Sequence, residues 1–131
     1  MASLTFAASA FADGKVTLSG PIEEDPAASV KLVVVKQGGA PKSVKNVRIK
    51  NLLVNCDNGD ARIALSLSGA AKVEERRKFH KVYVDGKSKV VLDGKVKADS
   101  SKVVADISGS EVRVDGSGDC KVPNVSFKAK K

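Results

Sequence analysis

Apolar and polar residues alternate along most of this chain, as in β-strands that bury one face. Residues 61–67 show the pattern most clearly, because Ala61, Ile63, Leu65 and Leu67 occupy every second position. No stretch keeps a helical period of about 3.6 residues over several turns. The pattern predicts short strands at residues 15–19, 30–36, 43–56, 61–67, 79–84, 89–97, 103–107, 112–114 and 122–129.

Turn-forming residues separate these segments. Residues 20–26 contain Pro21 and Pro26, which predicts a loop because proline cannot donate to a β-ladder. Residues 57–60, 85–86 and 115–119 combine Asp with Gly, and residues 108–110 (SGS) predict a further turn. Short strands with turns at this spacing indicate an all-β fold, either an antiparallel β-sandwich or a flattened β-barrel of about nine strands.

Two segments depart from simple alternation. Residues 30–36 are apolar on both faces, which predicts a central strand covered on both sides. In residues 43–56 the apolar positions change from odd, as in Ile49, to even, as in Leu52. This change predicts a β-bulge near Lys50 and Asn51.

The length of 131 residues fits one domain, which we place at residues 13–131. Residues 1–12 have no charged side chain and end in Ala10, Phe11 and Ala12, a small-x-small pattern that a signal peptidase recognises. We therefore interpret residues 1–12 as the remnant of a secretory signal, or as a disordered N-terminus. The competing interpretation is a first strand with Leu4 and Phe6 that turns at residues 13–14.

The net charge of +8 points to anionic partners, because the chain has 23 Lys and Arg against 15 Asp and Glu. Nucleic acid is an unlikely partner, since most of the cations are Lys and few aromatic residues are present for base stacking. No apolar run reaches the roughly 18 residues that a membrane span needs. The candidate anion-binding residues are Arg76, Arg77, Lys78 and Lys81, together with the tail residues Lys128, Lys130 and Lys131.

Cys56 and Cys120 lie beside acidic, turn-rich segments. Two thiols without histidine partners cannot complete a zinc site. A disulfide that joins two strand ends is the simplest interpretation, and two buried free thiols are the alternative. A disulfide would place the protein in an oxidising compartment, so we expect it to be secreted.

A calcium site is the sharpest chemical hypothesis. If Cys56 bonds Cys120, four carboxylates gather around that bond, and Ca²⁺ prefers carboxylate and carbonyl oxygens on loops. Tight turns, however, demand the same residue types. The four candidate ligands are Asp57, Asp60, Asp115 and Asp119.

Catalytic templates are poorly supported. His80 is the only histidine, and no Gly-x-Ser-x-Gly motif is present. The acidic pairs at residues 23–24 and 74–75 fall in charged loops, and the chain has no Trp to hold a sugar ring. We therefore expect neither an enzyme nor a cofactor.

Several segments together resemble a family of small secreted β domains of unknown function from actinobacteria. They are residues 15–22 (KVTLSGPI), 28–35 (ASVKLVVV), 39–44 (GAPKSV), 47–51 (VRIKN), 56–59 (CDNG) and 118–129 (GDCKVPNVSFKA). The resemblance implies export through a signal peptide and pairing of the two cysteine positions. It implies no activity and no ligand.

These observations predict a secreted, non-catalytic and monomeric β domain. We expect it to present a surface to an anionic cell-envelope polymer or to another secreted protein. A structural extracellular module without a specific ligand is the alternative, and a small secreted hydrolase is a weaker one.

Overall fold

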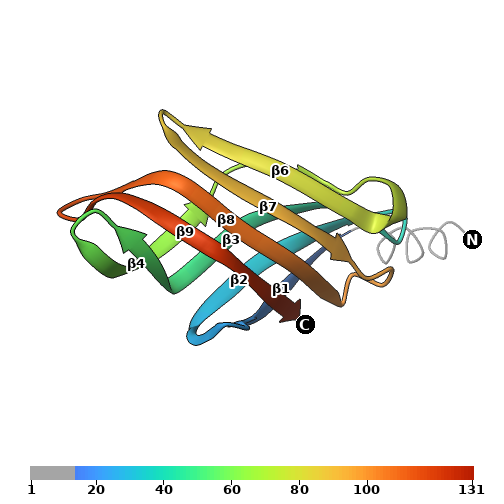
Figure 1. Ribbon diagram of the computed structural model, residues 1–131. Coiled ribbons are helices and arrows are strands. Elements are labelled where there is room, and N and C mark those ends of the chain that lie inside the picture. The colour runs from blue at the N-terminus through green and yellow to red at the C-terminus, as the bar shows by residue number, and fades with distance from the viewer. Residues whose placement is uncertain (1–13) are drawn as a thin grey trace, which may run out of the picture.

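The protein is an all-β domain, as the sequence predicts (Figure 1). The computed structural model describes residues 14–131, so both interpretations of residues 1–12 lie outside the described residues. Within this range no helix is long and apolar enough to cross a membrane. The elements are β1 (Gly14–Ile22), β2 (Asp25–Gln37), β3 (Ala40–Cys56), β4 (Gly59–Leu67), β5 (Ala71–Lys72), the 3₁₀ turn η1 (Glu75–Arg77), β6 (Lys78–Asp85), β7 (Ser88–Val96), β8 (Lys102–Val114) and β9 (Gly118–Lys130).

The strands form one antiparallel sheet that folds over itself. Its order is β4-β3-β2-β1-β9-β8-β7-β6, and the short β5 pairs with β3. An additional pairing of β3 with β9 closes β1, β2, β3 and β9 into a small ring, which is the barrel-like part of the fold. Figure 1 shows β6 to β9 crossing in front of β1 to β3, so the sheet makes two layers. The edge strands of the sheet are β4 and β6.

The core lies between these layers and follows the alternation of the sequence. On β9, Val125, Phe127 and Ala129 are buried, as the pattern predicts, while Lys128 and Lys130 point outward. The largest side chains in the core belong to both layers, which ties the two halves of the sheet together. They include Leu18, Leu32, Ile49, Phe79, Leu92, Ile107 and Phe127.

The predicted bulge in β3 is confirmed. The register of β3 against β4 shifts between Ile49 and Leu52, and Asn51 has a positive φ of 59°. Asn51 Nδ2 donates to the Ala27 carbonyl at 3.2 Å, and Arg62 donates to the Asn51 carbonyl at 2.9 Å. The bulge is therefore held by side chains from the neighbouring strands.

The prediction of a loop at residues 20–26 is wrong. Pro21 lies within β1 and Pro26 within β2, so the connection is only the two-residue turn at Glu23 and Glu24. The register of β1 against β2 shifts between Pro21 and Ile22. Strands tolerate proline at such an irregularity, because a ladder hydrogen bond is already interrupted there.

The turn predicted at residues 108–110 is also wrong, because β8 runs without interruption to Val114. Gly109 stays in the sheet opposite Val90 and Val122. A Cβ on Gly109 would stand 3.0 Å from the Lys89 carbonyl oxygen, so glycine here permits close strand contact.

Strand β2 is covered on one side only, contrary to the sequence prediction. Val30, Leu32 and Val34 are fully buried, whereas Val33 and Val35 are half-buried on the outer face. Val33 lies opposite Lys45, and Val35 lies opposite Lys15. Long lysine stems beside these valines can shield them without a further layer of structure.

Candidate functional site: a cationic sheet face

The outer face of β6 to β9 carries cationic side chains from neighbouring strands. In the sheet register, Lys78 lies opposite Lys95, and Lys95 lies opposite Val104. Val104 in turn lies opposite Lys128. Because neighbouring strands are about 4.8 Å apart, this row spans roughly 15 Å.

A second cationic row lies beside the first. Lys102 lies opposite Lys130, and the backbone N–H of Lys97 donates to the Lys102 carbonyl at 2.9 Å. Residues two apart on a strand point to the same side and are about 7 Å apart, so the two rows form one surface. We call this surface the cationic face; it consists of Arg77, Lys78, Lys95, Lys97, Lys102, Lys128 and Lys130.

A cleft of about 330 Å³ opens in the cationic face. Val96 and Val104 supply its apolar lining, and Val104 keeps 41% of its surface exposed. The cations that line the cleft are Arg77, Lys95, Lys97 and Lys102. An anion that enters it would meet several positive charges and an apolar floor.

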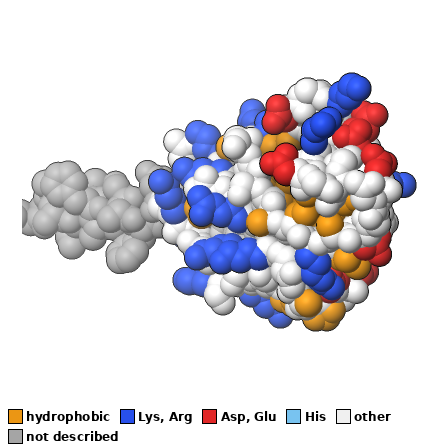
Figure 2. Space-filling view, turned by 90° about the vertical axis from the view of Figure 1, so that its left-hand side faces the viewer, with side chains coloured by type: hydrophobic (Ala, Val, Ile, Leu, Met, Phe, Trp, Pro, Cys, Tyr) orange, Lys and Arg blue, Asp and Glu red, His pale blue; other side chains and the backbone are white. Residues whose placement is uncertain are grey.

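Few ion pairs of the described residues involve this charge, although Asp93 and Asp106 lie opposite each other in the next row of the same face. The ion pairs among the described residues are Arg62–Asp25, His80–Asp93 and Lys128–Glu23. Only the last involves the cationic face, with 3.5 Å between exposed groups, and such pairs typically contribute less than about 1 kcal/mol. Figure 2 views the left end of Figure 1; Lys and Arg side chains gather there on the side that is the back of Figure 1, where β1 to β3 run, and most Asp and Glu side chains lie on the other side.

The structure brings together the two distant halves of the predicted anion-binding cluster. Arg77 ends η1 and Lys78 begins β6, while Lys128 and Lys130 come from the end of β9. The residues that connect them are Lys95, Lys97 and Lys102, which no local charge run in the sequence indicates. Alternation places these lysines on outer positions, but it cannot show that β7 and β8 lie between β6 and β9.

The remaining members of the predicted cluster have other surroundings. Lys81 points to the opposite side of β6, where its Nζ lies 5.4 Å from the centre of the Tyr83 ring. Arg76 is exposed in η1. The backbone N–H of Lys131 donates to the Ser101 carbonyl at 3.2 Å, which keeps the chain end beside the start of β8.

A smaller cationic group lies on the outer face of the other layer. Lys31 lies opposite Arg48 there, and Lys45 lies near Lys15. The positive charge of Lys15 holds the pKa of Lys45 below its usual value. Like charges are therefore crowded on this layer too.

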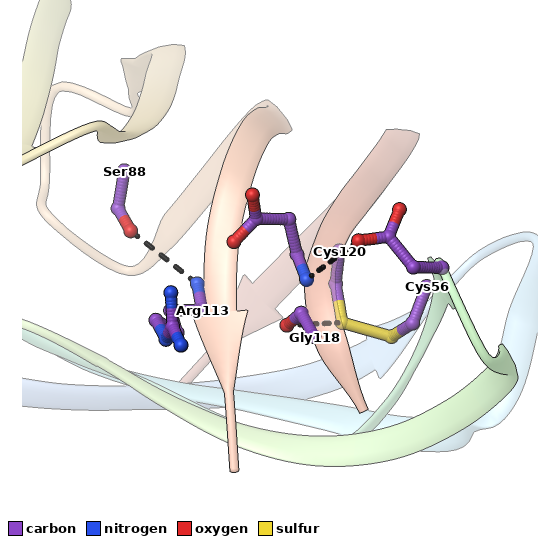
Figure 3. Close-up of a disulfide and its surroundings, with 7 residues drawn as sticks. Cys56, Ser88, Arg113, Gly118 and Cys120 are labelled. Atoms are coloured by element: carbon purple, nitrogen blue, oxygen red, sulfur yellow. Dashed lines mark hydrogen bonds between the residues drawn. A yellow bond between two sulfur atoms is a disulfide. The ribbon is translucent and has the colours of Figure 1, made fainter. Parts of the chain in front are cut away.

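The disulfide between Cys56 and Cys120 is confirmed, with an S–S distance of 2.01 Å. The two residues are register partners at the pairing of β3 with β9 that closes the ring. Figure 3 shows the bond running from the end of β3 to β9. The alternative of two free thiols is thereby excluded for the folded protein.

Hydrogen bonds of two acidic residues beside the disulfide join the β3–β4 turn to β9. The backbone N–H of Asp57 donates to the Asp119 carbonyl at 3.1 Å, and the Asp57 carboxylate accepts from the Asp119 N–H at 3.2 Å. Among residues 14–131, no group of three or more His, Cys, Asp or Glu side chains is arranged to hold a metal ion. The structure thus does not gather Asp60 and Asp115 with Asp57 and Asp119 into a calcium site.

The candidate acid–base residues lie on the surface. His80 Nδ1 is 3.6 Å from Asp93 Oδ1 across the β6–β7 ladder, and both side chains are exposed. Glu24 accepts a hydrogen bond from the Ser126 N–H at 2.9 Å, which attaches the β1–β2 turn to β9. The His80 imidazole and the Glu24 carboxylate therefore make contacts within the sheet surface and do not lie together in one site.

Comparisons with protein-family models, with curated proteins and with solved structures found no match for this chain. Its function therefore has to be argued from the geometry described above. The resemblance to secreted actinobacterial β domains stays a prediction.

Proposed function

We propose that this chain is a non-catalytic binding module whose cationic face holds an anionic polymer of the cell envelope. The single observation that carries the proposal is the sheet register, which places lysines of β6, β7, β8 and β9 on one face, beside a cleft lined by Arg77, Lys95, Lys97 and Lys102. Among the ion pairs of the described residues, only Lys128–Glu23 involves this face.

A polymer fits this face better than a compact anion. The two rows extend over roughly 15 Å, more than one small anion can contact at once. Six of the seven cations are lysines, whose ammonium groups are mobile point charges without the fixed fork of arginine. Such groups suit a partner with repeated negative charges more than one with a single rigid anionic group.

Export of the protein is part of the same proposal. Disulfides persist in oxidising compartments, so the Cys56–Cys120 bond supports a location outside the cytoplasm. An anionic envelope polymer would be available in that location.

Neutralising two central lysines of the cationic face tests the proposal. We expect Lys95→Gln/Lys102→Gln to weaken binding of dextran sulfate by about 10- to 30-fold at low salt, because each lysine near an anionic surface contributes about 1 kcal/mol. Binding by the unchanged protein should also fall as salt rises, since screening acts on exposed charges. Isothermal titration calorimetry at several salt concentrations measures both effects.

The matched control is Lys31→Gln/Lys50→Gln, which removes the same charge from the outer face of the other layer. We expect this variant to bind nearly as well as the unchanged protein, and neutral dextran not to bind. Equal losses in the two variants would show an effect of net charge alone and would refute a specific role for the cationic face.

A further inference from the structure

A second cleft, of about 740 Å³, lies between the two edge strands of the sheet. It is separate from the cationic face, because its walls are the last residues of β4 and the inner side of β6, with β7 and β8 contributing the floor. The layers are joined where β9 pairs with β1 and with β3. The edge strands β4 and β6 are not paired with each other, and the cleft lies between them.

Part of the lining of this cleft is apolar. Leu67, Val90 and Val112 belong to the core but keep 4–7% of their surface exposed, more than most core residues. Leu65 and Tyr83, which are half-buried, add to the same lining. The volume of this cleft falls within the range of about 300–1,000 Å³ of sites that bind one small molecule, and polar side chains make up the rest of its lining.

A hydroxyl without a hydrogen-bond partner lies beside the apolar part of the lining. The Tyr83 hydroxyl is sealed from solvent and has no hydrogen-bond partner. Burial raises the pKa of Tyr83, which keeps the hydroxyl protonated as a donor at neutral pH. A buried donor without a partner costs about 1–3 kcal/mol, and a shift of the Tyr83 side chain that brings the hydroxyl to a ligand acceptor would relieve that cost.

The charges of the lining favour an anion. Lys81 and Arg113 line the cleft, and Asp85 is its single carboxylate. None of the three belongs to an ion pair of the described residues. A ligand with one acidic group would therefore find two cations that have no carboxylate partner.

We propose that the cleft between β4 and β6 binds a small amphipathic anion, with an apolar body against Leu67, Val90 and Val112 and an acidic head near Lys81. An added β-strand from another protein is the competing occupant. Lys81 disfavours it, because an inward-pointing charge on an edge strand opposes further strand pairing. The inference does not depend on polymer binding at the cationic face.

Tyr83 supplies a local reporter for the test. The chain has one Tyr and no Trp, so its intrinsic fluorescence comes from this cleft. We expect laurate, below its micelle concentration, to change Tyr83 emission saturably with one-to-one stoichiometry. Dodecanol should bind more weakly, and dodecyltrimethylammonium should bind least because its head group is cationic.

Two lysine variants localise the effect. Lys81→Gln should weaken laurate binding by about tenfold, since a hydrogen-bonded charge is lost. Lys50→Gln, which removes the same charge from an exposed position of β3 outside the cleft, should leave laurate affinity unchanged. Backbone amide shifts at Leu67, Val90 and Val112 provide a reading that does not depend on Tyr83.

Three outcomes would overturn the inference. They are an unsaturable change in Tyr83 emission or none, equal affinity for the anionic and cationic probes, and equal losses in the two lysine variants. If laurate fails and an extended peptide instead shifts the amides along both edge strands, the cleft is a strand-docking edge. Loss of laurate binding with intact dextran sulfate binding would leave the proposed polymer function standing.

Discussion

Removing the disulfide should lower the free energy of unfolding by about 4 kcal/mol, because the Cys56–Cys120 bond closes a loop with a sequence separation of 64 residues. The bond joins the end of β3 to β9. Without it, the unfolded chain between these strands gains conformational entropy, which favours unfolding. For a domain of this size the melting temperature should fall by roughly 15 °C. Urea unfolding and calorimetry of Cys56→Ala/Cys120→Ala measure the two quantities.

Chemical reduction of the disulfide provides the control for this prediction. A reducing agent should destabilise the unchanged protein by about the same amount as the double substitution, and it should have no effect on the double variant. An unchanged unfolding midpoint in the double variant would contradict the role assigned to the bond in closing the ring.

Gly20→Ala should lower the free energy of unfolding by about 3 kcal/mol, which is at the upper end of the range for overpacked sites. A Cβ on Gly20 would overlap the backbone carbonyl oxygen of Lys128 and stand 3.3 Å from Ala129 Cα. Both obstacles are backbone atoms of β9, so they cannot move aside as a flexible side chain could. The β1–β9 pairing has only the register pairs Ser19–Lys130 and Ile22–Phe127, and Gly20 lies between them.

The neighbouring substitution Ser19→Ala is the control, because Ser19 is exposed and should change stability by less than about 0.5 kcal/mol. Chemical denaturation of both variants compares them directly. If Gly20→Ala were as stable as Ser19→Ala, the close contact of β1 with β9 would not exist in solution.

Much of the fold could be predicted because burial in this chain follows a period of two. The alternation at Val125, Phe127 and Ala129, and the change of parity that produces the bulge at Asn51, each correspond to an observed feature. The predicted turns at residues 20–26 and 108–110 are wrong, because proline and glycine there do not end the strands. In the folded sheet these residues lie at register shifts and close strand contacts instead.

The candidate site could be predicted only in part. The runs at Arg77–Lys78 and Lys128–Lys130 are visible as local charge clusters, but Lys95 and Lys102 join them only through the pairing of β7 with β8. Pairing between strands is set by the whole sheet, which a local pattern does not contain. The cleft between β4 and β6 depends on the sheet ending at two open edges, and no local signal indicates that either.

The cationic face and the cleft between β4 and β6 should attract ligands by different forces. The cationic face is exposed, so its attraction for an anion should be long-ranged and sensitive to salt. The cleft between the edge strands is partly apolar and sealed at Tyr83, so its binding should depend more on the shape and apolar area of the ligand. Salt dependence therefore separates the two activities in one protein.

Amide chemical-shift mapping with dextran sulfate at low and high salt tests the central claim most directly. We predict shifts concentrated at Lys78, Lys95, Lys102 and Lys128 at low salt, with their loss at high salt. Shifts of equal size on the outer face of the other layer, at Lys31 and Lys50, would contradict the assignment of binding to the cationic face. Shifts that persist unchanged at high salt would contradict its electrostatic basis.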